Sequence, residues 1–369
     1  MHSTWAEINL NNLADNFRGI KQRIGPGVKT LVAVKANAYG HGAVLVSRRL
    51  LAEGADMLGV AAVSEVAELR EAGIQAPVLL LGCTLPEAIG PALDLGARLT
   101  VCDIECARRV AEAARARKEP TAVHVKVDTG MGRIGVRWSE AREFVQAVAA
   151  MEGLVVEGIF THFATADEAD KYFTYHQIAR FQEIIESLAR AGIAIPLRHA
   201  ANSSAVMDCP ESYLTMVRPG LILYGLHPGG GVSQSIPIKP VLCLKTRIMF
   251  VKEIEPGETV SYNRRFTARR RSRVVTLPIG YADGLSRDLS NRGQGIGGVR
   301  RAPIIGTICM DQTVIDVSEV APPRVGDEVV VYGRQGGEHI PVEEVAGLLR
   351  TIPYVITCAV GRRVPRIPV

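Results

Sequence analysis

The first 225 residues alternate between short apolar runs and amphipathic segments. Apolar runs rich in Val, Ile and Leu occur at residues 30–35, 57–63, 77–82, 99–103, 124–128, 156–163, 197–202 and 217–225. Between most of them, apolar residues recur with helical spacing, for example at 64–72, 104–117, 139–150 and 172–191. Buried strands that alternate with amphipathic helices are typical of a parallel sheet covered by helices, and eight such strands predict a closed (β/α)8 TIM-type barrel. An open doubly wound sheet is the alternative, although no GxGxxG turn follows the first strand.

The pattern changes after residue 226. Residues 227–240 (HPGGGVSQSIPIKP) are rich in Gly, Pro and Ser and are typical of a connector. Short β-rich runs then follow, separated by turn signals, at 241–254, 273–282, 303–310, 313–317 and 328–333. We therefore expect an α/β barrel over residues 11–232 and a mostly β domain over residues 233–369.

Composition and charge exclude several classes of protein. Hydrophobic residues make up 47% and charged residues 22%, as in ordinary globular proteins, and the net charge of +5 is mild. The basic cluster at 264–273 is interpreted as a solvated strand edge or subunit rim, so neither nucleic acid nor a membrane is expected as a partner. The seven cysteines are odd in number and form no CxxC pair, which predicts reduced thiols in a cytoplasmic protein and no metal site.

Polar residues fall at or near the ends of the predicted barrel strands, where barrel enzymes build their active sites. They are Lys35, Lys126, Asp128, His162, Asn202 and Arg218. A lysine desolvated in a barrel mouth becomes nucleophilic and is suited to joining an aldehyde cofactor. Residues 199–205 and 218–221 offer hydroxyl and backbone N–H groups for a phosphate, with Gly220 allowing close approach of the backbone.

The segment AVKANAYGHG (33–42) resembles the pyridoxal-lysine motif of bacterial alanine racemases. The resemblance extends over essentially the whole chain, from TWAEINL near the start to RRVPRI at the end. Further motifs of that family follow in order: KVDTGMGRIG (126–135), THFATAD (161–167), HAANSSA (199–205), VRPGLILYG (217–225), VSYNRRF (260–266), PIGYADGL (278–285), GTICMDQ (306–312) and TIPY (351–354).

The resemblance implies a fold and an assembly. It implies an N-terminal barrel that binds pyridoxal 5'-phosphate and a C-terminal β domain, with the strand in residues 1–10 joining the β domain. It also implies a head-to-tail homodimer, in which each site combines the barrel of one chain with the β domain of the other.

The resemblance also assigns the catalytic groups. Lys35 would hold the cofactor as an aldimine and serve as one proton-transfer base, and Tyr262 of the partner chain would serve as the other. A hydrogen-bond chain would run from Tyr262 through His162 to Arg218, which would face the pyridine nitrogen of the cofactor. An arginine there does not readily protonate the ring, so the ring is a weaker electron sink and plain racemisation is favoured over side reactions.

The remaining expected residues surround these groups. The phosphate would be held by the hydroxyls of Tyr39, Ser203 and Tyr354 and by the backbone of Gly220 and Leu221, with Asn202 orienting this shell. Arg133 and the backbone N–H of Met310 would bind the substrate carboxylate, and Lys126 matches a lysine that is carbamylated in many relatives. The residues expected at the entrance are Tyr281, Tyr354, Asp167, Arg287 and Asp311.

The implied activity is the interconversion of L- and D-alanine, supplying D-alanine for cell-wall peptidoglycan. The chain departs from the family pattern at Asn263, where glycine is usual, and at Val355, where an acidic residue is common. These departures leave a broad-specificity amino-acid racemase as an alternative. A decarboxylase of the same architecture is disfavoured by Arg218, and a non-catalytic carrier of pyridoxal phosphate by the presence of a β domain with Tyr262.

Overall fold

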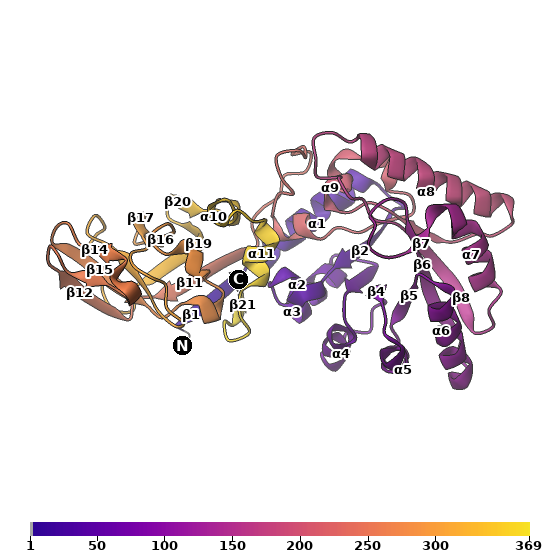
Figure 1. Cartoon of the computed structure of the whole chain (residues 1–369), viewed down its shortest axis with the longest axis horizontal. Coiled ribbons are helices and arrows are strands. Elements are labelled where there is room, and N and C mark those ends of the chain that lie inside the picture. Colours follow the sequence, from indigo (N-terminus) through magenta and orange to yellow (C-terminus); the bar gives the residue numbers. More distant parts are fainter. Residues whose placement is uncertain (1–2) are drawn as a thin grey trace.

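The computed structural model describes residues 3–369 and divides them into a helix-covered barrel and a β domain, joined along one side (Figure 1). The barrel strands are β2 (Lys29–Ala33), β3 (Met57–Val60), β4 (Val78–Cys83), β5 (Arg98–Val101), β6 (Thr121–Asp128), β8 (Leu154–Phe160), β9 (Leu197–His199) and β10 (Met216–Val217). Every pairing between neighbours is parallel, and β10 pairs with β2 while β5 pairs with β6, so the sheet closes. The predicted eight-stranded barrel is confirmed.

Helices cover the outside of the barrel. They are α1 (Leu10–Ile24), α3 (Ala43–Ala52), α4 (Val63–Glu71), α5 (Pro86–Asp94), α6 (Ile104–Arg117), α7 (Ala141–Ala149), α8 (Tyr172–Arg190) and the short α9 (Ser203–Asp208). Local signals explain where two of them begin, since the side chains of Asn9 and Asp103 accept N-cap hydrogen bonds from Asn12 and Cys106. The four helical segments expected between strands are confirmed to within two residues at each end.

One predicted strand is mostly wrong. The apolar run at 217–225 was expected to be extended throughout, but β10 ends at Val217 and Leu221–Tyr224 form a 3-10 turn, η3. Pro219 has no N–H to donate to a neighbouring strand, so it does not continue the ladder. The side chains of Leu221–Tyr224 are buried, as those of a buried strand would be. The apolar pattern of this turn is therefore the same as that of a buried strand.

The β domain contains a sheet in the order β17–β16–β19–β11–β1–β21, with β20 (Glu338–Ile340) paired to β19. The strands of the main path are β17 (Arg300–Pro303), β16 (Gln294–Gly297), β19 (Glu328–Gln335), β11 (Leu242–Arg247), β1 (Thr4–Ile8) and β21 (Arg366–Pro368). The N-terminal strand β1 lies between β11 and β21, with Ala6 opposite Leu244. Both ends of the chain are therefore built into this sheet.

Smaller sheets form the end of the β domain that lies away from the barrel in Figure 1. One has the order β12–β15–β18, formed by Phe250–Ile254, Ser272–Leu277 and Thr313–Asp316, and the other pairs β13 (Thr259–Val260) with β14 (Phe266–Thr267). Arg271 and Arg273 of the basic cluster pair with Glu253 across this surface. Helices α10 (Val342–Leu349) and α11 (Pro353–Cys358) return the chain towards the barrel.

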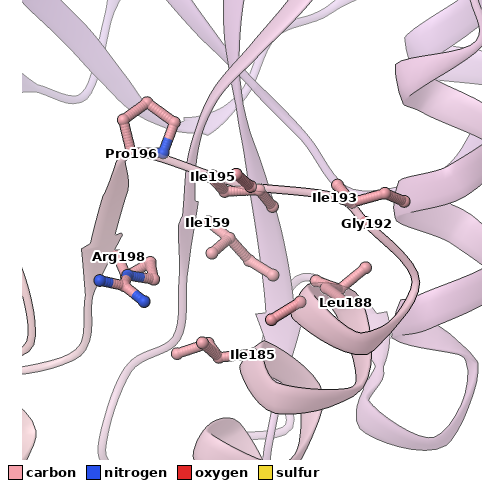
Figure 2. A pocket seen from close by; sticks show the side chains of 10 residues that line it. Ile159, Ile185, Leu188, Gly192, Ile193, Ile195, Pro196 and Arg198 are labelled. Atoms are coloured by element: carbon pink, nitrogen blue, oxygen red, sulfur yellow. The ribbon is translucent and has the colours of Figure 1, made fainter.

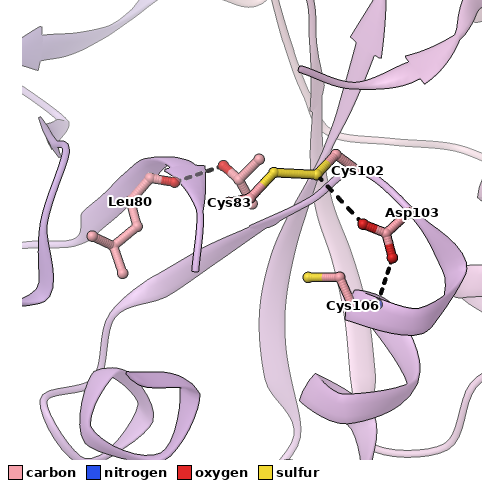
Figure 3. Close-up of a disulfide and its surroundings, with 6 residues drawn as sticks. Leu80, Cys83, Cys102, Asp103 and Cys106 are labelled. Atoms are coloured by element: carbon pink, nitrogen blue, oxygen red, sulfur yellow. Dashed lines mark hydrogen bonds between the residues drawn. A yellow bond between two sulfur atoms is a disulfide. The ribbon is translucent and has the colours of Figure 1, made fainter. Parts of the chain in front are cut away.

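The expectation of seven reduced thiols is wrong for two cysteines. Cys83, at the end of β4, forms a disulfide with Cys102, which directly follows β5 (Figure 3). The parallel register places Cys83 beside Thr100, so the two cysteines are neighbours across adjacent strands. Their separation of 19 residues resembles no recognisable motif, and sequence reasoning therefore missed the bond.

Candidate active site

The polar residues expected at the strand ends lie together at one mouth of the barrel. Lys35 follows β2, Lys126 lies near the end of β6, His162 follows β8, and Arg218 directly follows β10. Below them, part of the barrel interior is filled by the apolar cluster of Leu31, Met57, Leu79, Leu197 and Met216. The mouth is thus a polar layer that rests partly on packed apolar side chains.

Lys35 begins α2 (Lys35–Tyr39), a turn with an unusual backbone. Ala36, Asn37, Ala38 and Tyr39 all have φ between 52° and 54°, in the left-handed region that residues with side chains rarely adopt. The turn is held by hydrogen bonds from the Ala43 N–H to Asn37 Oδ1 at 2.7 Å and from the Ala36 N–H to Glu65 at 2.5 Å. Backbone of this kind persists only where the surroundings enforce it, and it is concentrated at functional sites.

The amine of Lys35 lies in an environment that disfavours its charged form. Burial lowers its pKa, and the positive charges of Arg133 and Arg218 lower it further, while Glu65 partly opposes them. An amine with a lowered pKa carries a free lone pair at lower pH, which is what attack on an aldehyde requires.

Arg218 is buried, and its guanidinium is held by an extensive set of acceptors. Its Nη1 donates to the backbone oxygen and the ring Nδ1 of His199, at 2.8 and 3.2 Å. Its Nη2 lies 2.6 Å from the Thr161 oxygen, 2.9 Å from the Ala200 oxygen and 3.2 Å from His162 Nδ1. Both Nη atoms thus have acceptors, whereas no acceptor for the Nε–H group is found within residues 3–369.

Phe160 supports two of the cations at the mouth. Lys126 Nζ lies 4.7 Å and the Arg218 guanidinium carbon 5.4 Å from the centre of its ring. Lys126 is only 3% exposed, and burial together with Arg218 and Arg133 holds its pKa well below the usual value. Burial, Arg218 and Lys126 likewise lower the pKa of His162, so its ring is neutral.

A group of hydroxyls and backbone N–H groups lies beside Lys35. Ser203 Oγ accepts a hydrogen bond from the Gly220 N–H at 3.0 Å, and a Cβ on Gly220 would lie only 2.8 Å from Tyr39 Oη. The ring of Tyr354, on α11, is 5.7 Å from that of Tyr39. Asn202 caps α9 by accepting from the Ala205 N–H, which fixes the position of Ser203. Leu221 opens the adjoining turn η3.

Apart from Tyr354, the expected site residues of the β domain lie away from this mouth. Tyr262, Tyr281 and Met310 are 67%, 44% and 53% exposed. They line two adjoining hollows of about 450 and 410 Å³, whose walls are all β-domain residues: Ser261, Tyr262, Tyr281, Arg287 and Ile308–Gln312. The structure therefore divides the expected site residues into two groups, one at the barrel mouth and one on the surface of the β domain.

The expected entrance residues divide in the same way. Asp167 follows β8 and lies near Tyr354. Burial, as the main cause, and the negative charge of Asp167 together raise the pKa of the Tyr354 phenol to about 12. Arg287 lines one β-domain hollow, and Asp311 forms an ion pair with Arg363 at 2.7 Å beside the other. Arg133, in the loop after β6, is exposed at the barrel mouth.

Sequence reasoning missed residues that lie beneath the mouth. His199, His124, Phe160 and Glu157 were within quoted strands but were given no role. What they share is a polar or aromatic side chain at a strand position that faces the barrel interior. Which positions face inwards can be predicted only once the strand register is known.

An apolar hollow is found far from this chemistry. It measures about 530 Å³ and lies outside the barrel wall, between β8, β9 and the end of α8 (Figure 2). Aliphatic side chains line it, with Arg198 as its charged residue. It lacks the nucleophile and the phosphate-binding groups that are found at the mouth.

None of the helices within residues 3–369 is long and apolar enough to cross a bilayer. The same range contains no group of three or more His, Cys, Asp or Glu side chains placed to hold a metal ion.

Comparison with known proteins agrees with this geometry over the whole chain. Residues 8–228 match the model of the N-terminal domain of alanine racemase, and residues 241–368 match that of its C-terminal domain. An alanine racemase of Desulforamulus reducens is 47% identical over 98% of this chain and 98% of its own length.

Solved structures give the same result. The structure of alanine racemase from Clostridium difficile 630 superposes with a TM-score of 0.96 at 39% identity, over 100% of this chain and 96% of that one. The alanine racemase of Bartonella henselae, solved with covalently bound pyridoxal phosphate, has a TM-score of 0.89 at 27% identity over the full length of both chains. The chain belongs to the alanine racemase family.

Proposed function

We propose that this protein interconverts L- and D-alanine with pyridoxal 5'-phosphate joined to Lys35. The observation that carries the proposal is the partly buried amine of Lys35, with a lowered pKa, beside a guanidinium and a cluster of phosphate-binding groups at one barrel mouth. When bound, the cofactor draws electrons away from the α-carbon of the amino acid and so acidifies its α-proton.

The residues at the mouth fit that cofactor. The Tyr39, Ser203 and Tyr354 hydroxyls, with the backbone around Gly220 and Leu221, suit the phosphate, and the absence of a Cβ on Gly220 keeps the Tyr39 hydroxyl in place. The free Nε–H of Arg218 suits the acceptor nitrogen of the ring. Arg218 stays cationic at neutral pH, since burial lowers its pKa only to about 9, so it donates a hydrogen bond to that nitrogen without surrendering the proton.

We assign the two proton-transfer roles to Lys35 and to Tyr262 of a second copy of the chain. Inversion at a carbon requires one base on each face, one to remove the proton and one to supply it. Tyr262 and Met310 lie in exposed hollows of the β domain rather than at the mouth of their own barrel. A head-to-tail homodimer, in which residues 233–369 of each chain complete the mouth of the other barrel, supplies both bases to each site. Arg133 and the Met310 N–H would then bind the substrate carboxylate.

Mixing two inactive variants tests this assignment. Lys35→Ala and Tyr262→Phe are each expected to be inactive as homodimers. A mixed dimer would contain one intact site, formed by Lys35 of one chain and Tyr262 of the other. Statistical mixing should restore about a quarter of the parental activity in a C2 dimer with shared sites. The assay follows circular dichroism from L-alanine and from D-alanine, with serine and lysine run alongside to measure specificity. No recovery on mixing, in a preparation shown to contain mixed dimers, would contradict shared sites.

Lys126, buried beside the proposed substrate-binding Arg133, is placed for a covalent modification. A buried neutral amine attacks carbon dioxide, forming an N–C bond and releasing one proton, and the resulting carbamate carries a negative charge beside Arg133 and Arg218. We propose this modification for Lys126 because burial and the surrounding cations favour its neutral form.

We also place the enzyme in the cytoplasm, where its product would supply peptidoglycan synthesis.

A further inference from the structure

A continuous hydrogen-bond chain runs from Arg218 down through the barrel interior. Arg218 Nη1 lies 3.2 Å from His199 Nδ1, and His199 Nε2 lies 2.9 Å from His124 Nδ1. His124 Nε2 then lies 3.1 Å from Glu157 Oε2, which also accepts from Arg98 Nε at 2.6 Å. Both imidazoles are completely buried, so water does not reach this chain between its ends.

The direction of every hydrogen bond in the chain follows from its two ends. A guanidinium only donates and an ionised carboxylate only accepts, so the two ends favour the same arrangement, in which His199 Nδ1 accepts and His199 carries its proton on Nε2. That proton is donated to His124 Nδ1, so His124 also carries its proton on Nε2 and donates it to the Glu157 carboxylate. Burial, as the main cause, lowers the pKa of both histidines, which keeps each ring neutral with a single proton.

A local irregularity brings Glu157 into the chain. Val123 pairs with Val156 and His124 pairs with Gly158, so Glu157 is one extra residue inserted into β8. Such a bulge redirects a side chain, and bulges are common next to active sites. The next residue has to be glycine, because a Cβ at position 158 would lie 2.3 Å from Nδ1 of His124. The dipeptide Glu157–Gly158 therefore delivers a carboxylate to His124 and leaves space for the imidazole.

We propose that Glu157 is a positioning residue for the active site, which sets the tautomers of His124 and His199 and thereby orients the Arg218 guanidinium from below. This inference rests on the proposed role of Arg218 towards the cofactor ring. Although burial raises the pKa of Glu157, hydrogen bonds from His124 and Arg98 lower it to about 2, so the carboxylate is ionised. The other carboxylate of this region, Asp128, is committed to the N–H groups of Gly130 and Gly132.

Removing the acceptor at the lower end should reverse the chain. In Glu157→Leu, His124 Nε2–H has no acceptor, so His124 favours the Nδ1–H tautomer and His199 is driven to carry its proton on Nδ1. That proton would then face Arg218 Nη1, and the guanidinium would have to turn or shift. Glu157→Gln keeps an oxygen acceptor of the same size and should retain the parental tautomers, with a smaller effect.

The test is nitrogen NMR of the holoenzyme labelled with 15N-histidine, together with the absorbance spectrum of the bound cofactor. We expect His199 to change tautomer in Glu157→Leu, the cofactor band to shift, and kcat to fall about tenfold, the effect of one lost hydrogen bond to a charged group. Glu157→Gln should restore most of the rate. Glu53→Gln is the matched control, because Glu53, like Glu157, has two basic partners, but they are Arg18 and Arg49 on the outer helices.

The outcomes separate the proposal from the function on which it rests. Unchanged histidine tautomers in Glu157→Leu would overturn the proposal, as would a rate and spectrum that match those of Glu53→Gln. If Glu157→Leu does not fold, Arg98→Met combined with Glu157→Met removes the same acceptor together with its ion-pair partner, and parental tautomers and spectrum there would also overturn it. The tautomer signal does not depend on racemisation, so an inactive parent enzyme would refute the function while leaving this reading intact.

Discussion

Replacing Gly220 with alanine should weaken cofactor binding through Tyr39. A Cβ at this position would lie 2.8 Å from Tyr39 Oη and 3.3 Å from its Cζ. Since ordinary contacts of carbon begin near ~3.5 Å, the hydroxyl would have to move by roughly 0.7 Å. That displacement is enough to break a hydrogen bond to the phosphate. A hydrogen bond to a charged group contributes about 1.5–3 kcal/mol, so the dissociation constant of the cofactor should rise roughly 10–100-fold.

The assay is titration of the apo-protein with pyridoxal phosphate, followed by absorbance. Tyr39→Phe should show a similar loss, and the double variant should lose little more than either alone, because both changes remove the same hydrogen bond. Gly90→Ala is the control, since its Cβ would meet only Arg117 at 3.5 Å on an outer helix. Parental affinity in Gly220→Ala, or full additivity in the double variant, would show that the Tyr39 hydroxyl does not bind the phosphate.

Other features give shorter predictions. The pKa of unmodified Lys126 is well below its unfolded value of 10.5, so between these two pKa values the unfolded chain binds more protons than the folded one. The free energy of unfolding therefore rises with pH in this range. In denaturant titrations, Lys126→Met should abolish the part of that rise that Lys126 contributes. With 13C-labelled carbon dioxide, the parent enzyme should show a carbamate signal that Lys126→Met lacks. Thiol titration of the unreduced, unfolded chain should find five free thiols rather than seven, and loss of the Cys83–Cys102 bond should cost about 3 kcal/mol. Seven free thiols in freshly lysed cells would show that the bond does not form in the cell. Gly158→Ala should lower the melting temperature by roughly 4 °C, as expected for about 2 kcal/mol of overpacking against His124 in a barrel of this size.

The sequence predicted those features that depend on periodicity. Each of the eight barrel strands overlaps a predicted apolar run, because burial on both faces leaves a continuous apolar signature, although β10 shares only Val217 with its run. In the β domain, β16 and β17 were missed, since Gln294–Gly297 and Arg300–Pro303 are glycine-rich or charged. The run at 303–310 was wrongly expected to be a strand. It contributes only Pro303, which ends β17, and an isolated bridge from Ile304 to Ile315.

Predicting the site was limited in a different way. Lys35, His162 and Arg218 stand at strand ends, which the order of elements makes visible. The supporting chain through His199 and His124 depends on which side chains turn inwards, and Glu157 enters it through a bulge that shifts the register by one residue. No period in the sequence reports such an insertion, because the side-chain alternation on each side of it is intact.

The charge of the barrel mouth connects these observations. The positive charges of Arg133 and Arg218 lower the pKa of both Lys35 and Lys126, and no ion pair to any of these four side chains is found in residues 3–369. A cluster of cations without counter-ions is costly to bury, so the mouth is built for anions that arrive later. The phosphate of the cofactor, the carboxylate of the amino acid and a carbamate on Lys126 would each offset part of this cost. Cofactor binding should therefore stabilise the barrel by more than its contact area suggests, and the gain should shrink as added salt screens the exposed edge near Arg133.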